Sequence, residues 1–381
     1  MKIVIAMDSF KGTLTAPAAC TAVARGILSE RADVELVERP MADGGEGTAQ
    51  TLIAATGGEW AIERVMGPLP EMQVDAGYAW LPGSEPGALI EMAQASGLIL
   101  LAEDRLDPLR TTTYGTGQLL QAACDRGAER LWLAVGGSAT VDGGVGAAMA
   151  LGWSFRDRAG NSIGHGGAEL ERIQSIVPPT DIDLPPVEVL CDVDNPLCGK
   201  RGAAAVYGPQ KGATPQMVER LDAGLAHLAD VVRRDLGREI EDLPGAGAAG
   251  GLAAGGVAFM DATLVSGIEA VMKATSLAEH LATADWVVTG EGRFDEQSLY
   301  GKVVSGISNL AQASGTRVAV LAGSVELSSE RATRSGISAV EASRTEGMSL
   351  EEALERSEPL LVEAARRFAR DHLASTEASS S

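Results

Sequence analysis

The sequence has few of the residues on which common metal and disulfide sites depend. Its 381 residues include 4 histidines and 4 cysteines, with neither a CxxC pair nor an HExxH motif. These absences argue against a zinc site and against a disulfide framework. Aromatic residues make up only 4%, whereas there are 46 glycines. The chain is therefore expected to pack small side chains and to make many tight turns.

Cations are also scarce. There are 31 lysines and arginines against 52 acidic residues, which gives a net charge of -21. This balance argues against nucleic acid and against an anionic membrane surface as partners. The first apolar run ends at Asp8, too early for a signal-peptide core, and no run reaches the length of a membrane span. We expect a soluble cytoplasmic protein.

The sequence does contain a repeated order of apolar strand, polar loop and helix. Strands are predicted over residues 2–6, 34–38, 131–135, 187–191, 286–289 and 317–322, and helices over about 15–29, 48–55, 215–236, 302–313 and 350–374. This alternation indicates an α/β fold. It is clean at both ends of the chain and more mixed in the middle, where residues 72–80 and 88–92 are predicted to be further strands.

Several predicted strands run into loops of Gly, Asp, Ser and Thr, beginning at Asp8, Asp43, Gly136 and Gly290. Glycine lets backbone N–H groups approach a phosphate, and a following helix N-terminus favours an anion. Cations lie in or beside glycine loops at Lys11, Lys211, Arg293 and Lys302. Such loops suit a polyphosphate ligand and phosphoryl transfer. Each cation is, alternatively, simply solvated.

Acidic residues follow the same strands: Asp8, Asp43, Glu46, Asp142, Asp192, Asp194, Glu291 and Asp295. Carboxylates at strand ends can ligate Mg²⁺, and one could act as a base toward an alcohol. The alternative is that each bonds its own backbone in a turn. That alternative is weaker for Asp192 and Asp194, which flank the end of an apolar strand and lead into Asn195-Pro196.

Two familiar fingerprints occur out of context. The GxGxxG match at Gly245, Gly247 and Gly250 follows Asp-Leu-Pro rather than a strand, so we interpret it as close packing of a small-residue helix. The GxSxG match at residues 160–164 also lacks a preceding strand and is interpreted as a surface turn.

Longer motifs carry a resemblance to a known family. They are residues 41–48 (MADGGEGT), 136–144 (GGSATVDGG), 191–197 (CDVDNPL), 208–213 (GPQKGA), 245–251 (GAGAAGG) and 289–293 (TGEGR). Together they resemble the bacterial glycerate kinases that phosphorylate the 2-hydroxyl, over nearly the whole chain. The resemblance implies ATP-dependent phosphorylation of D-glycerate to 2-phosphoglycerate, with Mg²⁺.

The resemblance also implies a two-domain α/β architecture. A flavodoxin/Rossmann-like parallel-sheet domain would be made from both chain ends, residues 1–65 plus 285–381. A second, mixed α/β domain, residues 66–284, would be inserted into it, with the active site in the cleft between the domains. The clean strand–loop–helix order at both ends of the chain agrees with this arrangement. A homodimer is left open.

Under this hypothesis the candidate site residues take specific roles. Asp192 is the suggested base, and Lys11 and Arg293 would pair with the acceptor carboxylate. The other predicted substrate-binding residues are Asp8, Ser9, Asp43, Gly44, Gly45, Asp194 and Asn195. The predicted nucleotide-binding residues are Gly136, Gly137, Ser138, Thr140, Gly290, Glu291, Gly292 and Lys302. The predicted Mg²⁺ ligands are Asp43, Asp192 and Asp194.

One departure from the family pattern bears on the substrate. Val141 stands where the family usually has asparagine. If that position contacts ligand, the acceptor preference is affected, which leaves a kinase for another small hydroxy acid as an alternative. A non-catalytic sensor of nucleotide or organic acid is an alternative of a different class. An NAD-dependent dehydrogenase would need a strand before Gly245.

Overall fold

The structure is a computed structural model that describes residues 1–45, 47–180, 183–299, 302–345 and 347–373. The chain forms two compact units. Unit 1 comprises Met1–Asp43, Gln50–Thr56 and the chain from Ile268 onward, and unit 2 comprises Gly44–Ala49 and Gly57–Gly267. Each unit has its own sheet. Glu46, one of the predicted acidic site residues, lies outside the described residues.

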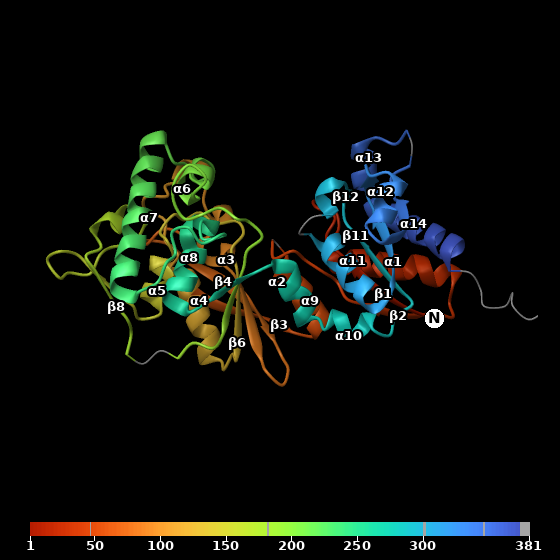
Figure 1. The fold of residues 1–381 in the computed structure, drawn as a ribbon, viewed down its shortest axis with the longest axis horizontal. Helices are drawn as coiled ribbons and strands as arrows, with labels where there is room; N and C mark the ends of the chain where they lie inside the picture. Colours follow the sequence, from red (N-terminus) through yellow and green to blue (C-terminus); the bar gives the residue numbers. More distant parts are fainter. Residues whose placement is uncertain (46, 181–182, 300–301, 346, 374–381) are drawn as a thin grey trace, which may run out of the picture. The chain divides into compact units, whose positions relative to one another are not determined.

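The sheet of unit 1 is built from both ends of the chain, drawn in red and blue in Figure 1. Its strands are all parallel and lie in the order β15-β13-β11-β1-β2. In chain order this is 2-1-3-4-5, the order of the flavodoxin-like doubly wound fold. The strands are β1 (Lys2–Met7), β2 (Glu35–Glu38), β11 (Trp286–Gly290), β13 (Arg317–Ala322) and β15 (Ile337–Ala342).

Helices cover both faces of this sheet, which explains why its central strands are almost wholly apolar. Alternate residues of β1, namely Ile3, Ile5 and Met7, share a core with helices α1 (Ala16–Glu30) and α14 (Ser357–His372). Val4 and Val287 are equally buried, and α11 (Val303–Ser314) packs on β11 and β13. The smaller elements of this part of the chain are α2 (Thr48–Thr56), α9 (Gly267–Ala274), α10 (Leu277–Leu281), β12 (Arg293–Phe294), β14 (Ser324–Val325), α12 (Ser329–Arg334) and α13 (Leu350–Glu355).

The long helix predicted over residues 350–374 is two helices. Helix α13 ends at Glu355, α14 begins at Ser357, and Arg356 between them has a non-helical ψ of 20°. Pro359 explains the break, because it cannot donate the hydrogen bond that would continue the first helix. Where α14 crosses α1, Gly26 is required, since a Cβ there would lie 2.4 Å from the carbonyl oxygen of Val362.

Unit 2 contains a mixed six-stranded sheet in the order β10-β9-β6-β5-β4-β3. Strands β10 (Thr263–Val265), β9 (Val187–Leu190), β6 (Arg130–Ala134) and β5 (Gly87–Glu91) are parallel, whereas β4 (Gln73–Leu81) and β3 (Glu59–Met66) are antiparallel. Its other elements are α3 (Ala93–Ser96), α4 (Tyr114–Asp125), α5 (Val145–Ala150), β7 (Ser154–Arg156), β8 (Ser175–Val177), α6 (Ala203–Tyr207), α7 (Pro215–Leu236) and α8 (Ala248–Met260). The prediction of an α/β fold with parallel strands is thereby confirmed.

Two helices of unit 2 show how local sequence sets its packing. Helix α7 begins at a Thr214 N-cap, whose side chain accepts from the Met217 N–H, and ends at Gly237 in the left-handed conformation. Helix α8 is apolar all round and buried. A Cβ on its Gly255 would lie 2.5 Å from the Gly143 carbonyl oxygen, so glycine allows the helix to approach that loop.

Among the described residues, no helix combines the length and the apolar composition needed to cross a bilayer.

Candidate active site

The strand order of unit 1 has a switch point between β1 and β11. The strand that follows β1 in the chain lies on one side of it, and the later strands lie on the other. In open α/β sheets, ligands bind beyond the carboxyl ends of the strands at such a point. Met7 pairs with Gly290 there, and the Asp8 N–H donates to the Gly290 carbonyl at 2.9 Å. The predicted site loops that begin at Asp8 and Gly290 therefore leave the sheet side by side.

Glycine is needed at Gly290, where the second loop crosses the sheet edge. A Cβ on Gly290 would lie 1.7 Å from the Leu321 carbonyl oxygen, whereas a Cβ on Gly292 would make an ordinary contact, 3.8 Å from the backbone nitrogen of Lys11. On the other side of β1, the Met41 N–H donates to the Met7 carbonyl at 2.9 Å. The segment that ends at Asp43 thus leaves the sheet beside the other two loops.

The Asp8 carboxyl is the most strongly perturbed acid of this edge. Burial raises its pKa to about 7, the N–H of Ser9 lowers it, the charges of Asp43 and Glu291 raise it, and Lys11 lowers it. The Ser9 N–H lies 2.6 Å from Asp8 Oδ1. Asp8, Ser9, Asp43, Glu291 and Lys11, all predicted site residues, are therefore brought to one place within unit 1.

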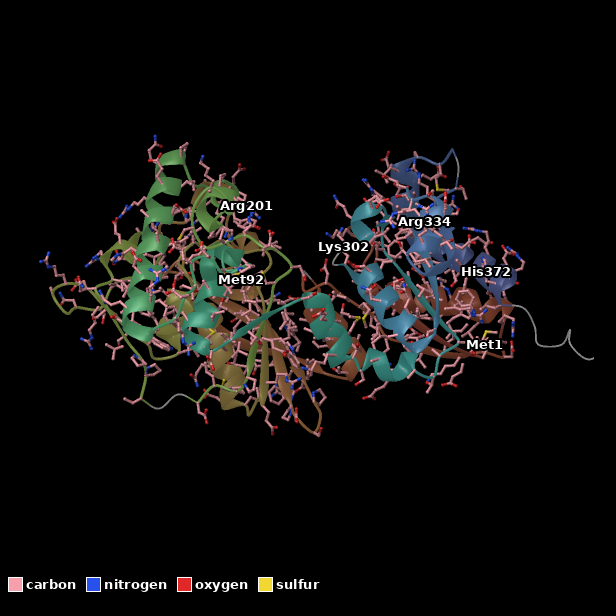
Figure 2. All side chains as sticks on the ribbon, viewed as in Figure 1. Met1, Met92, Arg201, Lys302, Arg334 and His372 are labelled. Atoms are coloured by element: carbon pink, nitrogen blue, oxygen red, sulfur yellow. The ribbon has the colours of Figure 1, made fainter. Side chains whose placement is uncertain are left out.

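Glu291 extends this acidic group toward two predicted cations. Burial raises the pKa of Glu291, Ser298 and Lys302 lower it, and Asp295 and Asp43 raise it. Lys302 is half-buried and immediately precedes helix α11 (Figure 2).

The other predicted cation of this loop, Arg293, is more exposed. Its side chain is 61% exposed and is held by Asp295 and Glu326, each at 3.0 Å. Arg293 is thus held by two carboxylates while much of its side chain stays accessible to solvent.

Four parallel strands of unit 2 end in register. Glu91 pairs with Ala134, Ala134 with Leu190, and Leu190 with Val265. The loops after these strands carry most of the remaining predicted residues. They share one edge of the sheet, which is again the carboxyl edge where ligands bind.

Asp192 is exposed at this edge. Its Oδ1 accepts the Gly267 N–H at 3.1 Å. The predicted substrate residue Gly44 lies close by: it is buried with φ of +87°, and a Cβ there would lie 2.9 Å from the Gly267 Cα and 3.8 Å from Asp192 Oδ2. Only glycine fits this crossing.

Glu91 belongs to the same edge and was not predicted. It accepts the Ala49 N–H at 3.1 Å. The available signal was a carboxylate that ends an apolar strand, at Glu91-Met92. The apolar pattern of residues 88–92 predicts only a strand.

Asp194 and Asn195 are used within unit 2. Asp194 is 79% exposed and paired with Arg201 at 3.2 Å. Asn195 Nδ2 donates to the Arg201 carbonyl at 2.8 Å, and its Oδ1 accepts the Tyr207 hydroxyl at 2.7 Å. Both polar atoms of the Asn195 amide thus have protein partners. The predicted roles of these two residues toward a ligand stay predictions.

The glycine loop after β6 is exposed at its start and buried at its end. Gly136 and Gly137 are exposed, the latter with φ of +71°, whereas Ser138 and Thr140 are buried. In the described part of the chain, the buried hydroxyl of Thr140 has no hydrogen-bond partner. The same holds in unit 1 for Thr289 Oγ1 and Glu291 Oε1. Unpaired buried oxygens beside both sheet edges are consistent with bound ligands.

Asp142 has a structural role, because it bonds to nearby backbone groups instead of facing a ligand. It is fully buried and accepts hydrogen bonds from the Thr113 N–H at 2.7 Å, the Thr113 hydroxyl at 2.9 Å, and the N–H groups of Gly144 and Gly146 at 3.2 and 3.3 Å. Burial raises its pKa and these bonds lower it. Asp142 therefore ties together the starts of α4 and α5.

The GxGxxG segment is a packing device, as predicted. A Cβ on Gly250 would lie 2.0 Å from the Thr140 carbonyl oxygen, and one on Gly247 would lie 2.4 Å from that of Pro196. Ala249, Gly250 and Gly251 are all left-handed, which places this turn directly behind the loop after β6.

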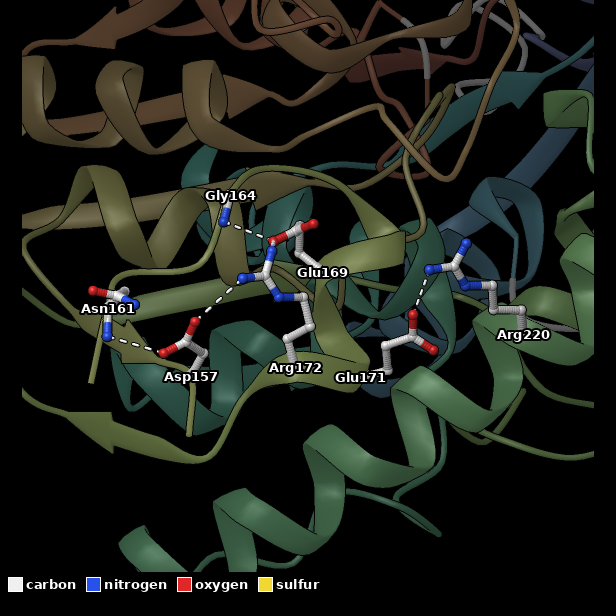
Figure 3. A network of polar contacts seen from close by, with 7 residues as sticks. All are labelled: Asp157, Asn161, Gly164, Glu169, Glu171, Arg172 and Arg220. Atoms are coloured by element: carbon white, nitrogen blue, oxygen red, sulfur yellow. Dashed lines mark hydrogen bonds and ion pairs between the residues drawn. The ribbon is translucent and has the colours of Figure 1, made fainter. Parts of the chain in front are cut away.

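A second polar group, drawn in Figure 3, lies on the segment from β7 to residue 172 and on α7. Arg172 bridges Asp157 at 3.2 Å and Glu169 at 2.7 Å, while Glu171 pairs with Arg220. Every carboxylate here has a cationic partner, and Asp157 also accepts the Asn161 N–H. These ion pairs stabilise the segment from residue 157 to residue 172, and each of the three carboxylates drawn is already paired with an arginine.

The protein has an α/β fold in which glycine loops and carboxylates lie beyond parallel strands, an arrangement that suits phosphorylated ligands. Comparison with known proteins is more specific. The glycerate kinase family model matches residues 3–373. This chain belongs to the glycerate kinase family.

Relatives and a solved structure agree over nearly the full length. A glycerate kinase of Halalkalibacterium halodurans is 46% identical over 96% of this chain and 97% of its own. The glycerate 2-kinase of Escherichia coli is 43% identical over 97% of both. A crystal structure from Salmonella typhimurium LT2, provisionally named glycerate kinase 2, matches with a TM-score of 0.87 at 43% identity, over 97% of this chain and 98% of that one.

Proposed function

We propose that this enzyme transfers the γ-phosphoryl group of ATP to the 2-hydroxyl of D-glycerate, giving 2-phosphoglycerate. Family membership supports a glycerate kinase. The position of transfer is supported by the name of the Escherichia coli relative, a glycerate 2-kinase. We further propose that the enzyme's two domains correspond to the two compact units. Strand β3 (Glu59–Met66) then belongs to the second domain because it pairs with β4, and residues 268–284 belong to the first, so the division expected at residues 65 and 285 is shifted.

The observation that carries the proposal is the switch point of unit 1. Two loops with glycine and carboxylate groups leave neighbouring strands there, joined by the bond from the Asp8 N–H to the Gly290 carbonyl. Phosphoryl transfer needs positioning and charge stabilisation more than covalent chemistry from the protein. Backbone N–H groups of such loops, with Lys11 and Lys302 beside them, supply both.

Glycine loops, cations and backbone groups would hold the substrates. The loop from Gly136 to Thr140 and the loop from Gly290 to Gly292 would bind nucleotide phosphates. Lys11 or Arg293 would pair with the acceptor carboxylate, where arginine offers two parallel donors. Gly44, Gly45 and Ser9 would bind the acceptor through their backbones or hydroxyl.

Two carboxylates are candidate bases toward the acceptor hydroxyl. Asp192 is exposed at its sheet edge. Asp8 has a pKa raised to about 7 by burial, which suits proton transfer near neutral pH. The Discussion describes substitutions that separate them.

The carboxylates present fit a magnesium ion. In the described residues no three His, Cys, Asp or Glu side chains form a ligand cluster. Mg²⁺ does not need one, because it is usually held by one or two carboxylates together with substrate phosphates. Asp43 is the best placed of the three predicted ligands, since its charge acts on Asp8 and Glu291, whereas Asp194 is paired with Arg201. When bound, Mg²⁺ would neutralise phosphate charge.

The position of Val141 supports D-glycerate as the acceptor. Val141 is fully buried in the core of unit 2 rather than exposed at the sheet edge. A Cβ on Gly250 would lie 2.7 Å from its Cα. We propose that a side chain packed this closely contributes to the core and not to the choice of substrate.

We therefore expect Val141→Asn to change stability and not specificity. Burying the amide without prepared partners should lower the free energy of unfolding by about 1–3 kcal/mol. The ranking of acceptors in a panel of small hydroxy acids should stay the same. A changed ranking in the folded variant would show that position 141 acts on the substrate after all.

A coupled assay of ADP release with D-glycerate, ATP and Mg²⁺ tests the function, followed by phosphorus NMR of the product. Phosphate on the 2-oxygen is the expected result. Phosphate on the 3-oxygen would keep the kinase and overturn the position of transfer. Nucleotide or glycerate binding by calorimetry with no ADP formed would favour the sensor.

A further inference from the structure

Lys211 is a buried lysine that the proposed reaction leaves without a role. It lies in the turn from Gly208 to Ala213, where the Lys211 N–H donates to the Gly208 carbonyl at 2.9 Å and the Ala213 N–H donates to the same carbonyl at 3.1 Å. Gly212 closes the turn with φ of +90°, and a Cβ there would lie 2.7 Å from the Leu106 carbonyl oxygen. Only 1% of Lys211 is exposed. The turn therefore fixes the lysine pointing inward.

The Lys211 ammonium ends beneath the glycine loop after β6. Its Nζ donates to Ser138 Oγ at 2.6 Å and to the Thr140 carbonyl at 2.8 Å. The lysine thus hydrogen-bonds to Ser138 and to Thr140, the first and last residues of the buried part of the loop. Burial lowers the pKa of Lys211 to about 7, and the charge of Asp142 partly opposes this by raising it.

Other residues of the loop also form hydrogen bonds to neighbouring segments of unit 2. The Ala139 N–H donates to the Ser96 carbonyl at 2.9 Å, and the Ala139 carbonyl accepts the Thr111 hydroxyl at 2.8 Å. The Gly137 carbonyl accepts the Leu98 N–H at 2.9 Å. The carbonyls of residues 137, 139 and 140 are thus all used internally.

The N–H groups at the front of the loop are different. Across the described residues, those of Gly136, Gly137 and Ser138 donate to no protein acceptor, and the Thr140 hydroxyl, fully buried, has no partner. A loop in which the carbonyls of residues 137, 139 and 140 are engaged and three consecutive N–H groups are unengaged favours an anionic oxygen as its ligand.

We infer that Lys211 is a positioning residue: it fixes the loop from Gly136 to Thr140 in the conformation that binds an anionic oxygen group of a substrate, either a nucleotide phosphate or the acceptor carboxylate. The inference rests on the proposed function, in which this loop contacts a substrate. Lysine reaches no substrate itself and acts through Ser138 and Thr140.

A purely structural role and a positioning role of Lys211 predict different kinetics for the same variant. A fully buried lysine is costly to desolvate, whereas methionine of similar length fills the space without that penalty. If Lys211 only filled the core, Lys211→Met would leave the kinetics unchanged. If it positions the loop, the variant stays folded and loses substrate affinity.

The test compares Lys211→Met with Lys200→Met, which changes an exposed lysine of the same unit. We expect Lys211→Met to stay folded, because removing a buried charge offsets part of the cost of losing the bonds to Ser138 and Thr140. We also expect the KM of one substrate to rise about tenfold or more, as the loss of a charged hydrogen bond allows, with the other KM within about twofold. A raised KM for ATP assigns the loop to phosphate, and a raised KM for D-glycerate assigns it to the carboxylate. Lys200→Met should match wild type.

Ser138→Ala provides a second variant that keeps the lysine. It should raise the same KM by a smaller factor, and adding it to Lys211→Met should cause little further loss, because both act through one contact. Kinetics of Lys211→Met within twofold of wild type would overturn the inference, as would lost activity that only follows unfolding.

Calorimetry with MgATP and with D-glycerate separates the two proposals. If wild type binds either ligand without turnover and Lys211→Met weakens that binding tenfold, the kinase proposal fails and the role of Lys211 stands. If wild type and Lys211→Met both turn over normally, the kinase proposal stands and the proposed role of Lys211 fails. If wild type binds neither ligand, both fail.

Discussion

Asp8→Asn should inactivate the enzyme and stabilise it at the same time. As a base or ligand contact at the switch point, the carboxylate is expected to contribute about a hundredfold or more to kcat. The asparagine oxygen can still accept the Ser9 N–H that lies 2.6 Å from Asp8 Oδ1. What the substitution removes is a carboxyl that burial disfavours and that Asp43 and Glu291 repel. Activity would thus be lost without loss of structure.

The stabilisation should depend on pH in a defined direction. The pKa of Asp8 is about 7 in the folded protein and 3.8 in the unfolded chain. Between these values the folded state holds a proton that the unfolded state releases, so the wild type loses stability as the pH rises through this window. Asparagine does not titrate. Its advantage should therefore be near zero at pH 4 and reach about 1–2 kcal/mol above pH 7, a value discounted because solvent reaches this half-buried group.

The measurement is urea unfolding at several pH values without nucleotide or Mg²⁺, together with steady-state kinetics. Asp192→Asn is the matched control, since Asp192 is an exposed carboxylate of the other sheet edge. It should not stabilise the protein at any pH. If Asp192→Asn abolishes turnover and Asp8→Asn leaves kcat within about threefold, Asp192 is the base. An equal gain for Asp8→Asn at pH 4 and pH 8 would contradict the raised pKa.

The sequence was sufficient to predict the strands and the edges that carry polar loops. Apolar runs such as residues 2–7 and 286–290 read as buried strands because both faces of their sheet are covered. The loops at Asp8 and Gly290 could be placed together only after the order of the strands was known, because pairing β1 with β11 joins residues more than 280 positions apart.

Side-chain direction was beyond the sequence. Lys211 stands in a polar, glycine-rich motif that suggests a surface loop, yet the left-handed Gly212 turns it inward. Val141 lies within a glycine loop, where the sequence leaves a ligand contact open, yet it belongs to the core. Asn195 Oδ1 accepts a hydrogen bond from the hydroxyl of Tyr207, which lies on helix α6. Each outcome depends on tertiary contacts that no local pattern encodes.

Asp142→Ala should be the most destabilising single change among the buried polar residues described here. Its two oxygens accept four hydrogen bonds, from Thr113, Gly144 and Gly146, and all of these groups are buried. Alanine would leave the donors without partners at the starts of two helices. We expect the free energy of unfolding to fall by about 3–5 kcal/mol, measured by urea unfolding.

Glu171→Ala is the control, because Glu171 and its partner Arg220 are about half exposed (49% and 46%) in the network of Figure 3. Losing that pair should cost less than about 1 kcal/mol. Asp142→Asn should fall between the two, since one amide oxygen can keep some of the bonds. Stability of Asp142→Ala close to that of Glu171→Ala would show that the helix starts do not depend on this carboxylate. Lys211 and Asp142 belong to one buried group, yet the two substitutions should have different effects. Removing the Asp142 carboxylate should destabilise the protein, whereas removing the Lys211 ammonium should leave the protein folded and change the conformation of the loop from Gly136 to Thr140.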